Sequence, residues 1–147
     1  MSLITDKVFY NALRSNVSLM EQVGGRIEST SIPVPDDEFE NTPVPYIIIT
    51  FDGLQNDGFT KDNSFEGNED KVQVSIEVAA ETRDDLGDLM QTIRQTVIDY
   101  FEDTDGHAWD DYDLVPKNYT LSATQVVYNP DKPSYEQALA YNCGTNP

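Results

Sequence analysis

The sequence contains very little positive charge. Nine lysines and arginines stand against 27 aspartates and glutamates among its 147 residues, which gives a formal net charge of −18. The nine cationic residues are spread between Lys7 and Lys132 and form no basic patch. Contacts with nucleic-acid phosphates and with anionic membranes need cations. The composition therefore predicts neither specific nucleic-acid binding nor membrane binding.

Cysteine and histidine are also scarce. Cys143 is the single cysteine, so an intramolecular disulfide cannot form, and His107 is the single histidine, so a His-rich metal site is excluded. The motifs of P-loops (G-x-x-x-x-G-K-S/T), dinucleotide-binding turns (G-x-G-x-x-G) and nucleophile elbows (G-x-S-x-G) do not occur. The sequence therefore predicts no catalytic residues, no metal site and no cofactor, and we expect that the protein is not an enzyme.

Long hydrophobic runs are missing as well. No stretch approaches the roughly 20 apolar residues that a membrane-spanning helix needs. The first residues, MSLITDKVFYNALRSN, lack the basic region followed by an apolar core that marks a signal peptide. We therefore expect a protein made in the cytoplasm. Apolar residues at 38% and aromatic residues at 10% predict a packed fold, and the length suits a single domain over residues 1–147.

Periodic apolar residues predict two main helices. The first spans 4–15, and the second spans 83–102, where Thr82 is a candidate N-cap. Their apolar stripes consist of Ile4, Val8, Phe9, Ala12 and Leu13 in the first, and of Leu86, Leu89, Met90, Ile93, Val97, Tyr100 and Phe101 in the second. A short helical piece at 18–23 is expected to end at Gly24 and Gly25, because glycine accepts the left-handed backbone conformation.

Alternating or continuous apolar segments predict the strands. The expected strands are 26–32, 46–51, 71–80, 118–128 and 134–143. Together with the helices they give an α+β fold, in which a mostly antiparallel sheet of about five strands carries the two main helices.

The segment TPVPYIIITF at 42–51 is the most hydrophobic strand of the chain. Pro43 and Pro45 each remove a backbone donor, so we expect strand pairing to begin at Tyr46. Tyr46 and Ile48 point to one face, while the alternate residues from Ile47 to Phe51 point to the other. Two helices can cover only one face of the sheet. The second apolar face therefore predicts association with another subunit.

Four aromatic residues are candidates for such an interface. Phe59 and Phe65 lie in the polar, glycine-rich segment 53–69, where they either fold back onto the domain or insert into a neighbour. Tyr135 and Tyr141 share one face of the last strand, in a region rich in apolar and tyrosine side chains. We predict these four residues as interface residues.

Two other interpretations remain open from the residues alone. Asp103, Asp105, His107 and Asp110 could form a carboxylate–histidine site of a metal-dependent hydrolase, although an acidic turn in solvent explains the same residues. The strong negative charge also fits an acidic binding module, either a DNA mimic or an inhibitor of a basic host protein.

Several motifs occur in an order that resembles a known family. A helix leads to VGGRI at 23–27, prolines precede PYIIITF at 45–51, and the strand KVQVSIEVAAE at 71–81 leads into the helix at 83–102. This arrangement resembles the small tail-terminator, or tail-completion, proteins of long-tailed bacteriophages and prophages. The resemblance covers roughly residues 4–128, and the segments 53–69 and 103–117 and the last strand do not align with it.

The resemblance implies a structural protein of the virion. It implies an α+β fold and a homo-oligomeric ring, typically a hexamer, that caps the tail tube and joins it to the head. The implied partners are tail-tube and head-completion proteins, and the implied location is the cytoplasm of the host or lysogen cell and then the virion. The family has no catalytic residues to carry over. A negatively charged passage suits this role, because it would not retain DNA.

Overall fold

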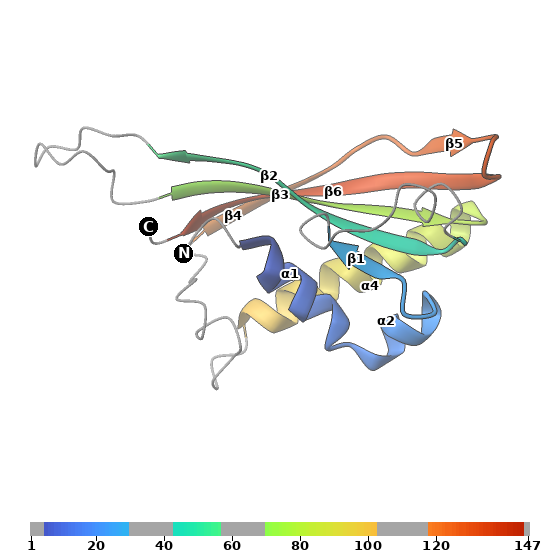
Figure 1. Ribbon diagram of the computed structural model, residues 1–147, viewed down its shortest axis with the longest axis horizontal. Helices are drawn as coiled ribbons and strands as arrows, with labels where there is room; N and C mark the ends of the chain where they lie inside the picture. The colour runs from blue at the N-terminus through green and yellow to red at the C-terminus, as the bar shows by residue number, and fades with distance from the viewer. Residues whose placement is uncertain (1–4, 30–42, 57–69, 103–117, 146–147) are drawn as a thin grey trace, which may run out of the picture.

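The computed structural model describes residues 5–29, 43–56, 70–102 and 118–145. Three helices and six strands lie within these ranges. In chain order they are α1 (Thr5–Arg14), α2 (Val17–Gln22), β1 (Ile27–Ser29), β2 (Tyr46–Asn56), β3 (Asp70–Ala80), α4 (Arg83–Glu102), β4 (Asn118–Ala123), β5 (Val127–Asn129) and β6 (Ser134–Thr145). The strands form one sheet, and all three helices lie on the same side of it (Figure 1).

The sheet has the strand order β1-β2-β3-β6-β4, and β5 pairs with the other end of β6. β1 runs parallel to β2, whereas the other pairings are antiparallel. A parallel pair needs a connection of about a dozen residues or more, and residues 30–45 connect these two strands. The predicted α+β class is confirmed. Two details are corrected, since the described sheet has six strands rather than about five and is mixed.

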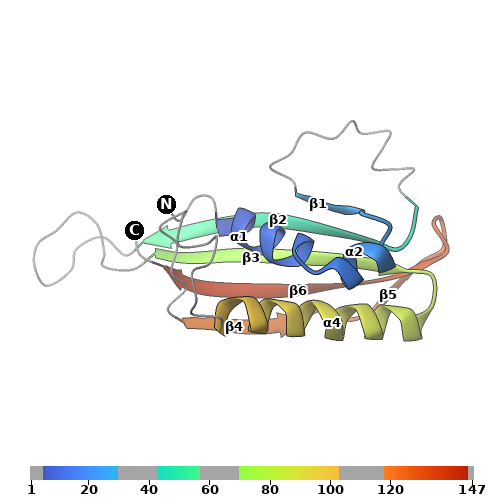
Figure 2. The same ribbon diagram turned by 90° about the horizontal axis from the view of Figure 1, so that it is seen from below.

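The sixth strand arises because the predicted strand 118–128 is interrupted at Thr124. The Thr124 backbone N–H donates to the Ala138 carbonyl at 3.0 Å, and the Ala138 N–H donates to the Thr124 hydroxyl at 3.0 Å. Gln137 Nε2 donates to the Thr124 carbonyl at 2.9 Å. Side chains thus take over hydrogen bonds that a regular ladder would make, and the edge of the sheet divides into β4 and β5 (Figure 2).

The hydrophobic strand β2 begins at Tyr46, as the prolines predicted. Its start is tied to Arg26, the residue before β1, because Ile47 N–H donates to the Arg26 carbonyl and Arg26 Nε donates to the Pro45 carbonyl, both at 2.9 Å. β2 continues to Asn56, five residues beyond its predicted end. The register shifts between Phe51 and Gly53, which inserts Asp52 as an extra residue in the manner of a β-bulge.

The hydrophobic core lies between the sheet and the helices. Alternate residues of β3 are buried toward the helices, as predicted, and Ile47 and Ile49 of β2 are fully buried beside them. The core side chains of β3 are Val72, Val74, Ile76, Val78 and Ala80, and those of the helices include Val8, Phe9, Ala12, Leu13, Leu19, Leu86, Leu89, Met90, Ile93 and Val97. Most members of the helical stripes predicted from the sequence therefore face the core from α1 and α4, Tyr100 is partly buried, and Ile4 and the Phe101 side chain lie outside the described residues.

Local signals for the helix ends are also confirmed. Gly24 and Gly25 have φ angles of 60° and 76°, and Gly25 N–H donates to the Met20 carbonyl at 2.8 Å to close α2. Thr82 caps α4, since its hydroxyl accepts a hydrogen bond from Asp85 N–H at 3.1 Å. Within the described ranges, no helix is long and apolar enough to cross a membrane.

Candidate functional site

One face of the sheet carries no helix of the described chain, and we call it the open face (Figures 1 and 2). The strand registers place its residues in rows that run across the sheet. In one row, Tyr46 pairs with Ala79, Ala79 pairs with Glu136, and Glu136 pairs with Val127. The neighbouring row contains Ile48, Glu77 and Ala138. The open face therefore combines apolar side chains with carboxylates near its β5 end.

The apolar side chains of the open face are only partly covered. Tyr46 and Ile48 are half-buried, in contrast to Ile47 and Ile49 on the other side of the same strand, which are fully buried. The prediction that both faces of this strand are apolar is confirmed, and the described helices cover only one of them. Apolar area that stays in contact with water in the single chain is available to an interaction partner.

The electrostatics of the open face are dominated by acids. The pKa of Glu77 is raised from its usual value, first by burial and then by the negative charges of Asp52 and Glu136. The pKa of the Tyr46 hydroxyl is also raised, first by burial, then by the charges of Glu136 and Glu77, and by a hydrogen bond with Glu136. Both raised pKa values indicate that an additional negative charge is unfavourable at this position.

Glu136 and Tyr46 each contact a residue from β5 or from the turn that follows it. Asn129 Nδ2 donates to Glu136 Oε1 at 3.2 Å, and Lys132 Nζ lies 5.2 Å from the centroid of the Tyr46 ring. Farther along the open face, the Ser75 hydroxyl donates to the Asp52 carboxylate. The turn between β5 and β6 thus positions the acidic end of the open face.

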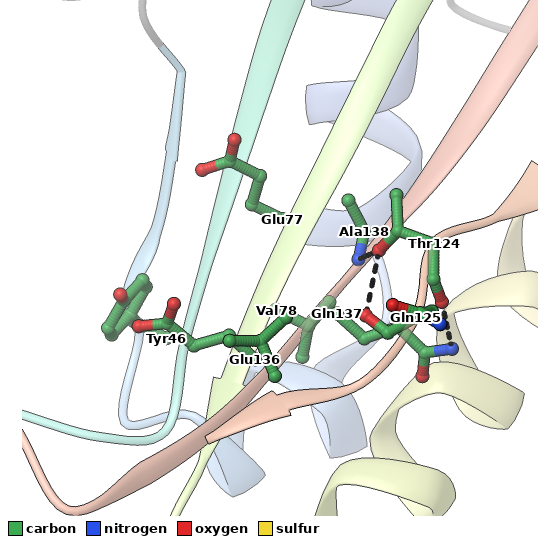
Figure 3. Close-up of a pocket in the computed structure, with 9 residues that line it drawn as sticks. Tyr46, Glu77, Val78, Thr124, Gln125, Glu136, Gln137 and Ala138 are labelled. Carbon is green, nitrogen blue, oxygen red and sulfur yellow. Dashed lines mark hydrogen bonds between the residues drawn. The ribbon is translucent and has the colours of Figure 1, made fainter. Parts of the chain in front are cut away.

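A shallow pocket of about 270 Å³ opens where β4 passes into β5, and we call it the β5 pocket (Figure 3). Four strands and the segment between β4 and β5 contribute to it. Its lining residues are Tyr46, Glu77, Val78, Thr124, Gln125, Val127, Glu136, Gln137 and Ala138. Figure 3 shows the carboxylates of Glu77 and Glu136 on the side of the sheet where the Tyr46 ring lies. The β5 pocket is therefore acidic with partly apolar walls.

The edge strand beside this pocket exposes large apolar side chains. Val127 is 56% exposed and Tyr128 is 52% exposed. The Tyr128 ring packs at a tilt against Tyr135, with 5.1 Å between the ring centroids. Exposed apolar side chains on a sheet edge are typical of contact surfaces. Val127 therefore extends the apolar part of the β5 pocket, whereas Tyr128 lies on the other side of the strand, next to Tyr135.

The predicted interface residues have different locations. Tyr135 is partly buried against the core and contacts Tyr128 at the surface. Tyr141 has no exposed surface and packs against Phe9 in the core, with 5.1 Å between the rings. The assignment of Tyr141 to an interface is therefore corrected, because its face of β6 is the one that the helices cover. Phe59 and Phe65 lie outside the described residues.

Within the described ranges, the remaining chemical candidates add no reactive or metal-binding group to this surface. Cys143 is buried, and burial raises its pKa to about 12, so the reactive thiolate is not populated at neutral pH. The described ranges contain no group of three or more His, Cys, Asp or Glu side chains that could hold a metal ion. The acidic segment with Asp103, Asp105, His107 and Asp110 lies outside these ranges.

Sequence reasoning did not identify Glu77, Glu136 and Val127 as site residues. Glu77 lies on the polar side of β3, a position that follows from the alternation of apolar and polar residues along this strand. Its proximity to Glu136 could not be predicted from the sequence, because Glu136 is distant in the chain and adjoins Glu77 only through the pairing of β3 with β6.

No protein-family model and no curated protein matches the chain. Among solved structures, its fold is similar to a chain described as "Virion of native gene transfer agent (GTA) particle". The TM-score is 0.57 and the sequence identity 13%, and the similarity covers 97% of this chain and 94% of the other. At this level of identity the similarity establishes a shared fold over almost the whole length of both chains.

Proposed function

We propose that this chain is a structural component of a phage-like virion and works by assembly rather than by catalysis. The observation that carries the proposal is the fold shared, over almost its whole length, with a chain of a gene transfer agent virion. Because a fold supports many functions, this similarity supports the proposal only together with the surface of the chain itself.

The open face supplies that second line of support. It leaves Tyr46 and Ile48 partly exposed, and Val127 continues the apolar area to the edge of the sheet. Such a surface suits a subunit that becomes fully covered only in an assembly. The net charge of −18 suits a component past which DNA moves without being retained.

In the more specific form of the proposal, the chain is a tail terminator. Copies of it form a ring, typically of six subunits, that caps the tail tube and joins it to the head through head-completion proteins. The protein is then made in the cytoplasm of the host or lysogen cell and becomes part of the virion. The motif order from VGGRI at 23–27 to the helix at 83–102 supports this form.

Assembly can be tested directly with the purified chain. Light scattering after gel filtration should detect a closed oligomer of about six times the chain mass as the concentration is raised, and negative-stain images should contain rings. A second sample should contain tail tubes of the phage or prophage that encodes the chain, where rings are expected at tube ends. A protein that stays monomeric in both samples and leaves tube ends bare would contradict the proposal.

The acidic binding module remains the alternative. It predicts salt-sensitive retention of a basic host protein by the single chain, without rings. A pull-down at low salt from a host lysate, followed by the ring assay on the same preparation, separates the two functions. Retention of a defined basic protein by a chain that never forms rings would favour the alternative.

A further inference from the structure

The β5 pocket combines features that select one kind of occupant. Its two acidic side chains come from different strands, Glu77 from β3 and Glu136 from β6, and both face outward from the open face (Figure 3). Its volume of about 270 Å³ is below the roughly 300–1,000 Å³ of typical small-molecule sites. A side chain inserted from a partner protein fits this size better than a cofactor does.

The walls of the pocket are partly apolar. Val127 is 56% exposed and lines the pocket, and the Tyr46 ring and Ala138 add apolar surface to its walls. A long side chain with an apolar stem and a charged end would cover this surface and keep its charge near the acids. Lysine and arginine have this build.

The charges of the pocket favour a cation. Glu77 and Glu136 repel one another, and this repulsion contributes to the raised pKa of Glu77. An incoming positive charge would relieve the repulsion, whereas a phosphate or a carboxylate would increase it. The chain itself is a poor source of cations, with nine basic against 27 acidic residues. Charge complementarity therefore indicates a partner with a different sequence.

We propose that the β5 pocket binds a lysine or arginine side chain carried on an apolar segment of a different protein. The basic group lies between Glu77 and Glu136, and its apolar neighbours cover Val127 at the sheet edge. The identification of the partner as another virion component rests on the proposed function. The proposal that the pocket binds a basic side chain rests only on the residues of the pocket.

The binding test uses a peptide probe of defined chemistry. The blocked pentapeptide acetyl-Ser-Val-Arg-Val-Ser-amide is titrated into isotope-labelled protein, and amide chemical shifts are followed by NMR. Saturable shifts are expected at Glu77, Val127 and Glu136, and weaker binding is expected as salt is added. The same peptide with glutamate in place of arginine should produce no saturable shifts. Equal binding of both peptides, or shifts confined to other surfaces, would refute the proposal.

Variants of equal charge provide the decisive comparison. Glu77→Gln/Glu136→Gln should weaken binding of the arginine peptide at least about tenfold, because charge-assisted hydrogen bonds are lost. The control Glu21→Gln/Asp99→Asn removes two exposed acids from α2 and α4 and should leave the affinity unchanged. Thermal unfolding monitors whether each variant is folded. Equal loss of affinity in both double variants would mean that net charge alone attracts the peptide, and the proposal would be wrong.

The same samples separate this proposal from the proposed function. Ring formation is measured for the wild type and for Glu77→Gln/Glu136→Gln. Rings without site-specific peptide binding would refute the pocket and leave the assembly function intact. Specific peptide binding by a chain that forms no rings, alone or at tube ends, would support the pocket and contradict the tail-terminator function. If the double variant binds the peptide normally but loses ring formation, the pocket is a contact between copies of this chain, and the proposal is wrong.

Discussion

Ile48 and Ile49 are sequence neighbours with opposite environments. Ile49 is fully buried between the sheet and the helices, whereas Ile48 lies on the open face and is only partly covered. Both belong to the segment that looked uniformly hydrophobic in the sequence. Their different contributions to folding and assembly follow from the alternation of side chains along a strand.

Substituting these two residues should separate folding from assembly. Ile49→Ala is expected to lower the free energy of unfolding by about 2–5 kcal/mol, because it leaves a cavity in the core. Ile48→Ala is expected to cost about 1 kcal/mol, since much of that side chain already contacts water. Urea denaturation of the monomer measures both values. Ile48→Ala should nevertheless raise the concentration at which rings form, and equal losses of stability would contradict this assignment of faces.

Glu77 should make stability depend on pH. Its pKa is raised in the folded protein, so the folded state keeps this proton at pH values where the unfolded state has lost it. Asp52 and Tyr46 on β2 and Glu136 on β6 are the titratable groups that face it. The contribution of this proton to stability is therefore fully present at and below the usual glutamate pKa of 4.5 and is lost as the pH rises through the raised pKa of Glu77.

The variant Glu77→Gln should remove this contribution. The free energy of unfolding of this variant, relative to that of the wild type, is expected to increase as the pH is raised from about 5 to 8. This range lies above the sequence pI of about 4.1. Because the partly covered Glu77 side chain still contacts solvent, screening keeps the difference small. Chemical denaturation at several pH values measures it, with Glu21→Gln as the exposed control. A stability difference that is independent of pH would contradict the assigned shift.

At the scale of elements, α2 depends on its neighbours. It has six residues, too few to be stable by itself. Asn16 caps it by accepting a hydrogen bond from Leu19 N–H at 3.1 Å, and its Nδ2 donates to the Thr96 hydroxyl of α4 at 2.9 Å. One side chain therefore begins the helix and fastens it to the long helix 80 residues farther along the chain.

Substitution of Asn16 should reveal both roles. Asn16→Ala is expected to cost about 1–2 kcal/mol through loss of the cap and of the contact with Thr96. Asn16→Ser retains a capping oxygen but cannot donate across to α4 in the same way, so an intermediate loss is expected. Denaturation midpoints rank the three proteins. A serine variant as unstable as the alanine variant would assign the whole effect to the contact between the helices.

At the scale of the whole molecule, net charge opposes assembly. Each copy carries a formal charge of −18, so bringing copies together in a ring costs electrostatic free energy. In the proposed ring, apolar contacts at the open face would have to overcome this cost. Salt shortens the reach of the repulsion, with a Debye length of about 30 Å at 0.01 M and about 8 Å at 0.15 M.

Ring formation should therefore become easier as salt is added. The concentration at the midpoint of assembly is expected to fall between about 0.01 and 0.15 M salt, as measured by light scattering or mass photometry. A neutral solute at equal osmolality is the control. Binding of the arginine peptide should respond in the opposite direction. Rings that dissociate on addition of salt would instead indicate an interface held by ion pairs.

Much of the fold follows from local patterns. The two main helices, the glycines that end α2, the start of β2 after Pro45 and the alternation of β3 were all predicted and are confirmed. These features depend on backbone sterics and on a periodicity of two or 3.6 residues, both of which operate within a short stretch of chain. The segment 46–51 even indicated that one apolar face would remain uncovered.

The pairing partners and the covered face were decided only in three dimensions. The sequence by itself determined that Tyr135, Leu139 and Tyr141 share one side of the last strand, but alternation does not say which side the helices cover. The tertiary structure buries Tyr141 against Phe9 and brings Glu77 beside Glu136 on the opposite side. Residues far apart in the chain meet through strand order and register, and these depend on how the whole sheet buries its apolar surface.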